Sequence, residues 1–148
     1  MTVEMELVSV EAPVRPTRTP VVILREVAGQ RRVLPIFIGV PEAQAIALTM
    51  QNIETPRPMT HDLMKNLLDE VGAQVERITV TALRDGTFFA EIVLNTGGEV
   101  RTVSSRPSDA IALAIRIGSP IFAEEDVLDE AGRVEQPDEE QAEQMVEE

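Results

Sequence analysis

The sequence predicts an α+β fold in which a mixed or antiparallel sheet carries about three helices. Three observations predict it. Short Val- and Ile-rich segments outnumber helical patterns, the helical patterns begin at Pro or Thr beside an acidic residue, and one hairpin–helix pattern occurs twice. The length of 148 residues is that of one domain, and it suffices to bury a core without metals or disulfides.

The duplication is visible in the order of the elements. Residues 21–48 run strand, turn, strand, proline, acid and Ala-Ile-Ala-Leu, and residues 87–113 run in the same way. The tetrapeptide itself recurs at 45–48 and 110–113. Two such units predict a sheet that carries two equivalent helices.

The first half of the chain predicts strands, a loop and two helices, in this order: strands over 5–14, 20–27 and 31–38, a helix over 41–52, a loop over 53–59 and a helix over 60–72. Pro41 suits the first position of its helix. Thr60 is placed to cap the second helix, and Gly72 is placed to end it. Apolar residues recur in this helix at a spacing of four, as expected for an amphipathic helix: Leu63, Leu67 and Val71.

The second half predicts three strands, a helix and a short strand, in this order: strands over 73–83, 87–94 and 99–105, a helix over 107–118 and a strand over 119–122. Arg84-Asp85-Gly86 is a hairpin turn between the first two strands. Pro107 starts the helix and Gly118 closes it.

The acidity of the chain is concentrated at one end. Residues 123–148 hold 12 acidic residues and one basic residue, a net charge of −11, whereas residues 1–122 hold 14 acidic and 12 basic residues, a net charge of −2. We therefore expect a domain over 1–130 and an acidic, disordered or frayed-helical tail over 131–148, dispensable for folding. The near-neutral body is unlike a general nucleic-acid clamp, which is usually basic.

Composition excludes several kinds of site. The chain has no cysteine, which rules out disulfides, thiolate zinc sites and cysteine nucleophiles, and its single histidine rules out zinc sites with several histidine ligands. The absence of cysteine and of an apolar leader in MTVEMELVSVEAPV leads us to expect a cytoplasmic protein. No apolar run is long enough to span a membrane.

The first candidate site segment is the start of the helix over 60–72. Free amides and the helix dipole favour an anion there, and Arg57 and the Thr60 hydroxyl can add donors to one phosphate. His61 is the only histidine, the residue type whose unperturbed pKa lies near neutrality. Asp62 can orient a ring or hold a metal. The alternative is purely structural, with Thr60 capping and Asp62 favouring the dipole.

The second segment is Ser104-Ser105-Arg106-Pro107-Ser108-Asp109, and its counterpart in the first repeat places Glu42 in a first helical turn. Arg106 can bind phosphate and Asp109 can serve metal binding or proton transfer, although an acid at this position also stabilises a helix start. Phosphodiester hydrolysis needs these types of group, with Mg²⁺ or Mn²⁺ on carboxylates as one source of charge stabilisation. Against nucleic-acid binding, the chain lacks Trp and Tyr, and we expect its strand phenylalanines to be core residues: Phe37, Phe88 and Phe89.

Four motifs occur in the order found in one known family: LPIFIG-x-PEAxAIAL, RPMTHDL, GTFFAEIVL and SRPSDAIALAIR. Over about residues 5–130 the chain resembles the bacterial and plant bifunctional nuclease domain. The resemblance implies an α+β homodimer and, in some members, a nuclease acting on RNA and DNA. The positions that match the family pattern are Glu42, Arg57, Thr60, His61, Asp62, Arg106, Pro107, Ser108 and Asp109.

With the resemblance, the sequence predicts a homodimeric nuclease of low sequence specificity. His61 is the expected acid/base. The expected orienting or metal-binding carboxylates, for Mg²⁺ or Mn²⁺, are Glu42, Asp62 and Asp109. The expected substrate-binding residues are Arg57, Thr60, Arg106 and Ser108. The alternative is a non-catalytic module that binds a nucleotide or a protein partner and regulates gene expression, because the same helix starts suit a small phosphorylated ligand.

Overall fold

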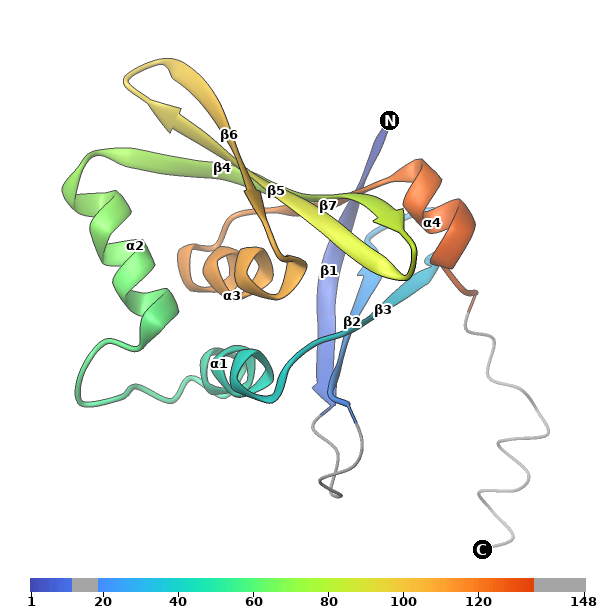
Figure 1. Cartoon of the computed structure of the whole chain (residues 1–148), viewed down its shortest axis with the longest axis horizontal. Helices are drawn as coiled ribbons and strands as arrows, with labels where there is room; N and C mark the ends of the chain where they lie inside the picture. The colour runs from blue at the N-terminus through green and yellow to red at the C-terminus, as the bar shows by residue number, and fades with distance from the viewer. Residues whose placement is uncertain (12–18, 135–148) are drawn as a thin grey trace, which may run out of the picture.

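The computed structural model describes residues 1–11 and 19–134. They form seven strands and four helices (Figure 1), in the order β1 (Thr2–Glu11), β2 (Val21–Glu26), β3 (Val33–Phe37), α1 (Val40–Met50), α2 (Thr60–Glu70), β4 (Ala73–Arg84), β5 (Thr87–Thr96), β6 (Glu99–Ser105), α3 (Pro107–Ile117), β7 (Ile121–Glu124) and α4 (Glu125–Ala131). The predicted α+β class is confirmed, with one helix more than expected.

All seven strands belong to one sheet with the order β3-β2-β1-β7-β4-β5-β6. Only the β4–β7 pair is parallel, so the sheet is mixed. The two predicted hairpin–helix units are β2–β3–α1 and β5–β6–α3, and their hairpins form the two ends of the sheet. One edge strand, β3, pairs through Val33 with Arg133, whereas β6 is exposed along nearly its whole length.

Helix α3 lies at the centre of the helical layer. It contacts α1 on one side and α2 on the other, and it packs on β4 and β5 (Figure 1). Its Ala-Ile-Ala-Leu segment, residues 110–113, is buried completely or to within 1%. The corresponding segment of α1 is half-buried except for Ile46, which is fully buried. The two helices are therefore not equivalent in packing. None of the described helices combines the length and apolar composition needed to cross a membrane.

Helix α4 is an element that the sequence did not predict, and it lies in the acidic segment after residue 122. Val127 and Leu128 are buried in the same core as the sheet residues. Arg32 donates hydrogen bonds to Glu125 at 2.6 Å and to Asp129 at 3.0 Å, which ties two acids of this short helix to the β2–β3 hairpin. The fold continues to Val134, and the predicted tail residues 135–148 lie outside the described residues.

The expectation that all three strand phenylalanines are core residues is wrong. Phe37 is 71% exposed and Phe89 is 40% exposed, so neither is a core residue, whereas Phe88 packs against the core. The apolar residues that recur at a spacing of four in α2 face solvent instead of the core: Leu63, Leu67 and Val71. Met64 and Leu68 form the buried side of this helix.

Candidate active site

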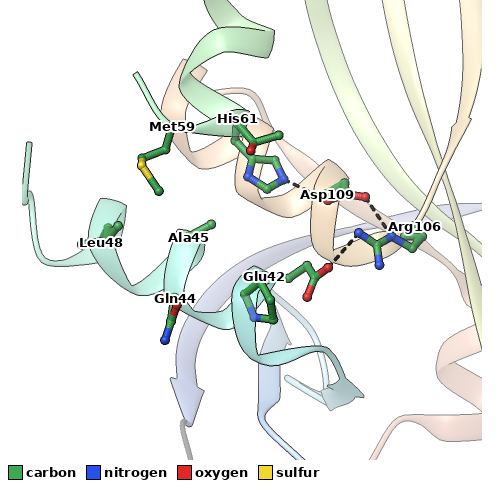
Figure 2. Close-up of a pocket in the computed structure, with 10 residues that line it drawn as sticks. Glu42, Gln44, Ala45, Leu48, Met59, His61, Arg106 and Asp109 are labelled. Atoms are coloured by element: carbon green, nitrogen blue, oxygen red, sulfur yellow. Dashed lines mark hydrogen bonds and ion pairs between the residues drawn. The ribbon is translucent and has the colours of Figure 1, made fainter. Parts of the chain in front are cut away.

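Three helix starts converge on one cavity. Glu42 is the third residue of α1, His61 the second residue of α2 and Asp109 the third residue of α3. The cavity, of about 270 Å³, lies between these helices (Figure 2) and is lined by Pro41, Glu42, Gln44, Ala45, Leu48, Met59, Thr60, His61, Arg106 and Asp109. Five of the eight predicted site residues therefore meet at one place.

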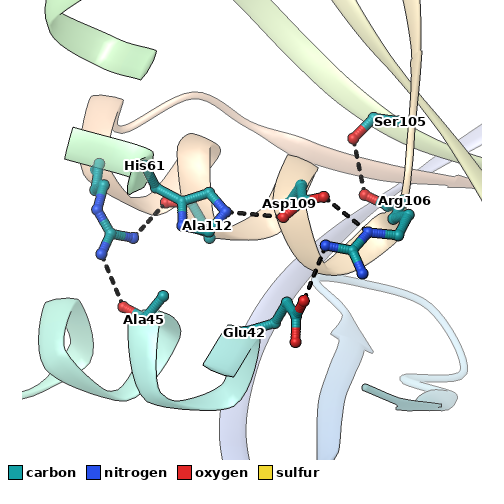
Figure 3. Close-up of polar contacts among 8 residues, drawn as sticks. Glu42, Ala45, His61, Ser105, Arg106, Asp109 and Ala112 are labelled. Atoms are coloured by element: carbon teal, nitrogen blue, oxygen red, sulfur yellow. Dashed lines mark hydrogen bonds and ion pairs between the residues drawn. The ribbon is translucent and has the colours of Figure 1, made fainter. Parts of the chain in front are cut away.

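Four polar side chains of the cavity form a continuous line of contacts (Figure 3). His61 Nε2 lies 2.9 Å from Asp109 Oδ1. Arg106 Nε donates to Asp109 Oδ2 at 2.9 Å, and Arg106 Nη2 donates to Glu42 Oε1 at 2.9 Å. The Arg106 guanidinium thus joins Glu42 of the first hairpin–helix unit to Asp109 of the second. Asp109 also contacts the His61 imidazole.

The charge of Asp109 decides the tautomer of His61. Burial of the Asp109 carboxylate opposes its ionisation, but hydrogen bonds from Arg106 and His61 outweigh this effect and lower the pKa of Asp109 below its usual value. An ionised carboxylate can only accept hydrogen bonds, so Nε2 of His61 carries the proton that is donated to Asp109. The other ring nitrogen, Nδ1, forms no hydrogen bond with any described residue and is left as an acceptor.

The imidazole of His61 and the guanidinium of Arg106 differ in their exposure to solvent. His61 is only 6% exposed, so its ring is fixed by packing and by Asp109. The side chain of Arg106 is 65% exposed although it makes two ion pairs. Hydrogen bonds to Asp109 and Glu42 raise the pKa of Arg106 further, so it is a permanent cation at the mouth of the cavity.

Asp62 does not join this group. It accepts the backbone N–H of Met59 at 2.9 Å, which stabilises the start of α2, and it accepts a hydrogen bond from Arg116 Nε at 2.7 Å. The hydrogen bond from Met59, followed by that from Arg116, lowers the pKa of Asp62 in spite of burial. Its contacts are those of a residue that holds α2 against α3.

The three remaining candidate residues differ in their position relative to the cavity. Arg57 is exposed and does not line the cavity. Ser108 lines a neighbouring cavity instead. Thr60 is the first helical residue and lines the cavity, while Met59 holds the N-cap position that was expected for Thr60.

The expected set of three metal-binding carboxylates is not assembled. Within residues 1–11 and 19–134, no three His, Asp or Glu side chains converge in an arrangement suited to a metal ion. Glu42 and Asp109 remain on the same cavity, on either side of Arg106. Magnesium often takes only one or two protein carboxylates together with substrate phosphate and water, so this pair fits such a cation and Asp62 does not.

Arg116 is the residue of this region that the sequence analysis missed. Its side chain is 5% exposed, and it donates to Asp62 of α2, to the Ala45 carbonyl of α1 at 2.9 Å and to the Ala112 carbonyl of α3 at 2.8 Å. It therefore fixes the three helices that carry the cavity. The signal was a single arginine in the otherwise apolar run AIALAIRIG.

Comparison with known proteins identifies the family. The bifunctional nuclease domain matches residues 22–136, most of the chain. The chain belongs to the bifunctional nuclease domain family. The match includes all three helix starts of the cavity and the four residues of its line of contacts.

The relatives fall into two groups by their sequence identity to this chain. An uncharacterized protein of Mycobacterium tuberculosis is 45% identical over 118 residues, which cover 80% of this chain and 70% of that protein. Bifunctional nuclease 1 of Arabidopsis thaliana is 30% identical over 105 residues, 69% of this chain and 32% of the plant protein. Bifunctional nuclease 2 of Oryza sativa is 29% identical over the same shares. The chain thus spans about a third of the length of these plant proteins.

Proposed function

We propose that this member of the family is a nuclease that hydrolyses phosphodiester bonds of RNA or DNA with low sequence specificity. The observation that carries the proposal is the line of contacts His61–Asp109–Arg106–Glu42 in one cavity. It combines an oriented imidazole, which can activate a water molecule, with a permanent cation, which can contribute charge stabilisation at a phosphate. The names of the plant relatives point to the same chemistry.

Arg106 is the proposed phosphate ligand. Its Nε and one Nη2 proton are used for Asp109 and Glu42, which leaves three of the five guanidinium protons for a substrate. Arg106 follows the last residue of β6 and is the N-cap of α3. Its donors therefore lie beside a helix start, where anions are favoured. The Thr60 hydroxyl, at the start of α2, lines the same cavity and is a further donor.

His61 is the proposed general base. Its Nδ1 accepts a proton from a water molecule as the water oxygen forms a bond to phosphorus. The phosphorus–oxygen bond to the leaving nucleoside then breaks, and that oxygen takes a proton from solvent. Asp109 stabilises the imidazolium that forms and keeps the ring in the productive tautomer.

The charge of the cavity makes a divalent cation part of the proposal. With a neutral imidazole, Glu42, Asp109 and Arg106 sum to a charge of −1. A phosphodiester would be repelled by this charge, so a phosphate site here needs a further cation. Glu42 and Asp109 are the residues that would hold Mg²⁺ or Mn²⁺, which would supply charge stabilisation at the phosphate.

The test is a cleavage assay on the purified full chain with single-stranded RNA and DNA, with and without Mg²⁺ or Mn²⁺. His61→Ala should lower turnover by roughly 10²- to 10⁴-fold, the usual contribution of a general acid/base. Arg77→Ala, which removes an exposed arginine of β4 away from the cavity, is the matched control and should cleave normally. An inactive wild-type protein that still binds a nucleotide through Arg106 would favour the non-catalytic binding module.

We also propose that two copies of the chain form a homodimer. Four apolar side chains along α2 form a stripe, at a spacing of four residues, and each is about half exposed or more: Met59, Leu63, Leu67 and Val71. Such a stripe on a helix is typical of a protein contact. Light scattering should give a mass near twice 16.3 kDa, which Leu63→Glu with Leu67→Glu should halve. Asn66→Glu adds charge on the same helix outside the stripe and should leave the dimer intact. The cytoplasmic location stays a prediction.

A further inference from the structure

We propose that a second cavity, next to the candidate active site, binds a nucleobase of the strand whose phosphate lies at Arg106. This inference rests on the proposed nuclease function and adds a substrate subsite to it. The cavity, of about 350 Å³, lies between the end of β3, the β4–β5 turn and the start of α3. Arg106 lines both cavities, so a phosphate bound there would be adjacent to both.

The first observation is an aromatic ring at the wall of this cavity. Phe37 is 71% exposed, although it ends a strand whose neighbouring residue Ile36 is 2% exposed. Nucleobases stack on such rings with little dependence on base identity, because every base has a π-face. The exposed ring therefore supplies a stacking surface in a chain that has no Trp or Tyr.

The second observation is a pair of hydroxyl groups that line the cavity, those of Ser108 and Thr87. Ser108 is 5% exposed, lines the cavity and forms no hydrogen bond between its hydroxyl and any described residue. A hydroxyl can donate or accept, as can that of Thr87, which also lines the cavity. These groups suit the edge of any base, in keeping with low sequence specificity.

The combination distinguishes a nucleobase from a second phosphate. Apart from Arg106, no charged side chain among the described residues lines the cavity, and its other lining residues are apolar, glycine or hydroxyl-bearing. An aromatic ring with neutral hydrogen-bonding groups is suited to a flat, uncharged heterocycle. The arrangement of phosphate at Arg106 and base at Phe37 then describes a single-stranded substrate, because a paired base cannot stack on a side chain in this way.

The absence of Trp and Tyr from the chain provides a direct test. Phe37→Trp introduces the only tryptophan, and its fluorescence should be quenched when a single-stranded oligonucleotide binds to the full chain. An abasic strand of the same length and charge should bind without this quenching. Phe89→Trp, at a partly exposed ring outside the cavity lining, is the matched control and should show no quenching with either strand.

Affinity measurements separate the subsite from the phosphate site. Phe37→Ala should weaken binding of the oligonucleotide by roughly 5- to 150-fold and leave binding of the abasic strand unchanged. Ser108→Ala should have a smaller effect of the same kind, and Arg106→Ala should weaken both strands. Thermal melting shows that the variants are folded, and the wild-type cleavage assay is run alongside.

The outcomes are distinct. If wild-type protein cleaves the oligonucleotide but Phe37→Ala and Phe37→Trp show no base-dependent change, the subsite is wrong and the nuclease proposal stands. If wild-type protein neither binds nor cleaves either strand, both are wrong. If Phe37→Ala changes only the mass in light scattering, the ring belongs to a contact between copies and the subsite is overturned.

Discussion

The two hairpin–helix units, β2–β3–α1 and β5–β6–α3, begin their helices alike and use them differently. In each, the third helical residue is an acid, Glu42 or Asp109. The N-cap residue is Gly39 in the first unit and Arg106 in the second. A Cβ atom at position 39 would overlap the Glu42 carboxylate in its present position, so a side chain there would require Glu42 to move. The second unit has an arginine at this position, and it contacts both acids.

The repeated tetrapeptide is out of register with these helix starts. Glu42 precedes Ala45 by three residues, whereas Asp109 precedes Ala110 by one. A shift of two residues turns a helix face by about 200°. Ala110–Leu113 accordingly fall in the core, while most of the first copy is half-buried and partly lines the cavity. The two units therefore differ in role: α3 forms the core of the helical layer, and α1 forms a wall of the site.

The largest expected difference between the two units concerns the effect of their two acids on turnover. Asp109→Asn should lower turnover on the order of 10²-fold or more, because an asparagine amide can donate to Nε2 of His61 and move the ring proton to Nδ1, where it blocks the base. Glu42 contacts only Arg106, so Glu42→Gln leaves the tautomer of His61 unchanged. It should chiefly raise the concentration of divalent cation that is required for turnover. Initial rates over a Mg²⁺ series measure both. Equal losses of turnover at saturating cation would show that the acids are equivalent.

The stability of the two helices should differ in the same sense. Leu113 is 1% exposed, and Leu113→Ala should cost about 2–5 kcal/mol of unfolding free energy. Leu48, the matching residue of the first tetrapeptide, is half-buried at the cavity, so Leu48→Ala should cost less than about 2 kcal/mol. Urea unfolding of both variants gives the comparison. Similar losses would contradict the assignment of α3 as the core helix.

The two units also differ beyond the end of each tetrapeptide. Three positions beyond it, the first unit has Gln51 and the second has Arg116, which ties together all three site helices. Arg116→Gln should therefore destabilise the fold by about 1–3 kcal/mol at pH 7, because Asp62 loses its partner and two carbonyls lose a donor.

The pH dependence identifies the source of this loss. The pKa of Asp62 is lowered in the folded protein, so its contribution to stability is present above the ordinary pKa of 3.8 and is lost as the pH falls below that value. The difference between wild type and Arg116→Gln should accordingly shrink in melts below about pH 4. A difference that stays constant with pH would assign the loss to packing and to the two carbonyl hydrogen bonds, without a contribution from Asp62.

The helix starts and the order of the elements could be predicted because they depend on local residues. Pro41, Pro107 and Gly118 mark the boundaries of α1 and α3 within one or two positions. The contacts of the site could not be predicted, because Arg106 and Glu42 lie 64 residues apart and meet only when α1 packs on α3. Asp62 and Asp109 share one local pattern, an acid at the third helical position, and only the tertiary neighbours Arg116 and His61 distinguish them.

Helix α4 and the exposed ring of Phe37 were missed for the same reason. Four of the seven α4 residues are acidic, which indicates a solvated segment until Arg32, 93 residues away from Glu125, is known to pair with it. Phe37 belongs to an apolar run, but it alternates with the buried residues Ile36 and Ile38, so its side chain lies on the opposite face of the edge strand β3. Burial at the end of an element depends on what packs there, and this information is not local.

The smallest expected effect concerns the two edges of the sheet. The edge of the first unit is covered, because Val33 and Arg133 exchange two backbone hydrogen bonds of 2.7 and 2.9 Å, whereas β6 of the second unit is exposed. A chain ending at Val134 keeps this pairing and should melt like the full chain. A chain ending at Gly132 leaves the Val33 amide, in a residue 5% exposed, without its partner and should lose about 1 kcal/mol, roughly 2–4 °C in Tm. Equal melting temperatures of the two truncated chains would mean that the pairing of Val33 with Arg133 adds nothing to the stability of the domain. A large loss already at Val134 would instead show that residues 135–148 contribute to the stability of the domain, against the prediction that the acidic end is dispensable.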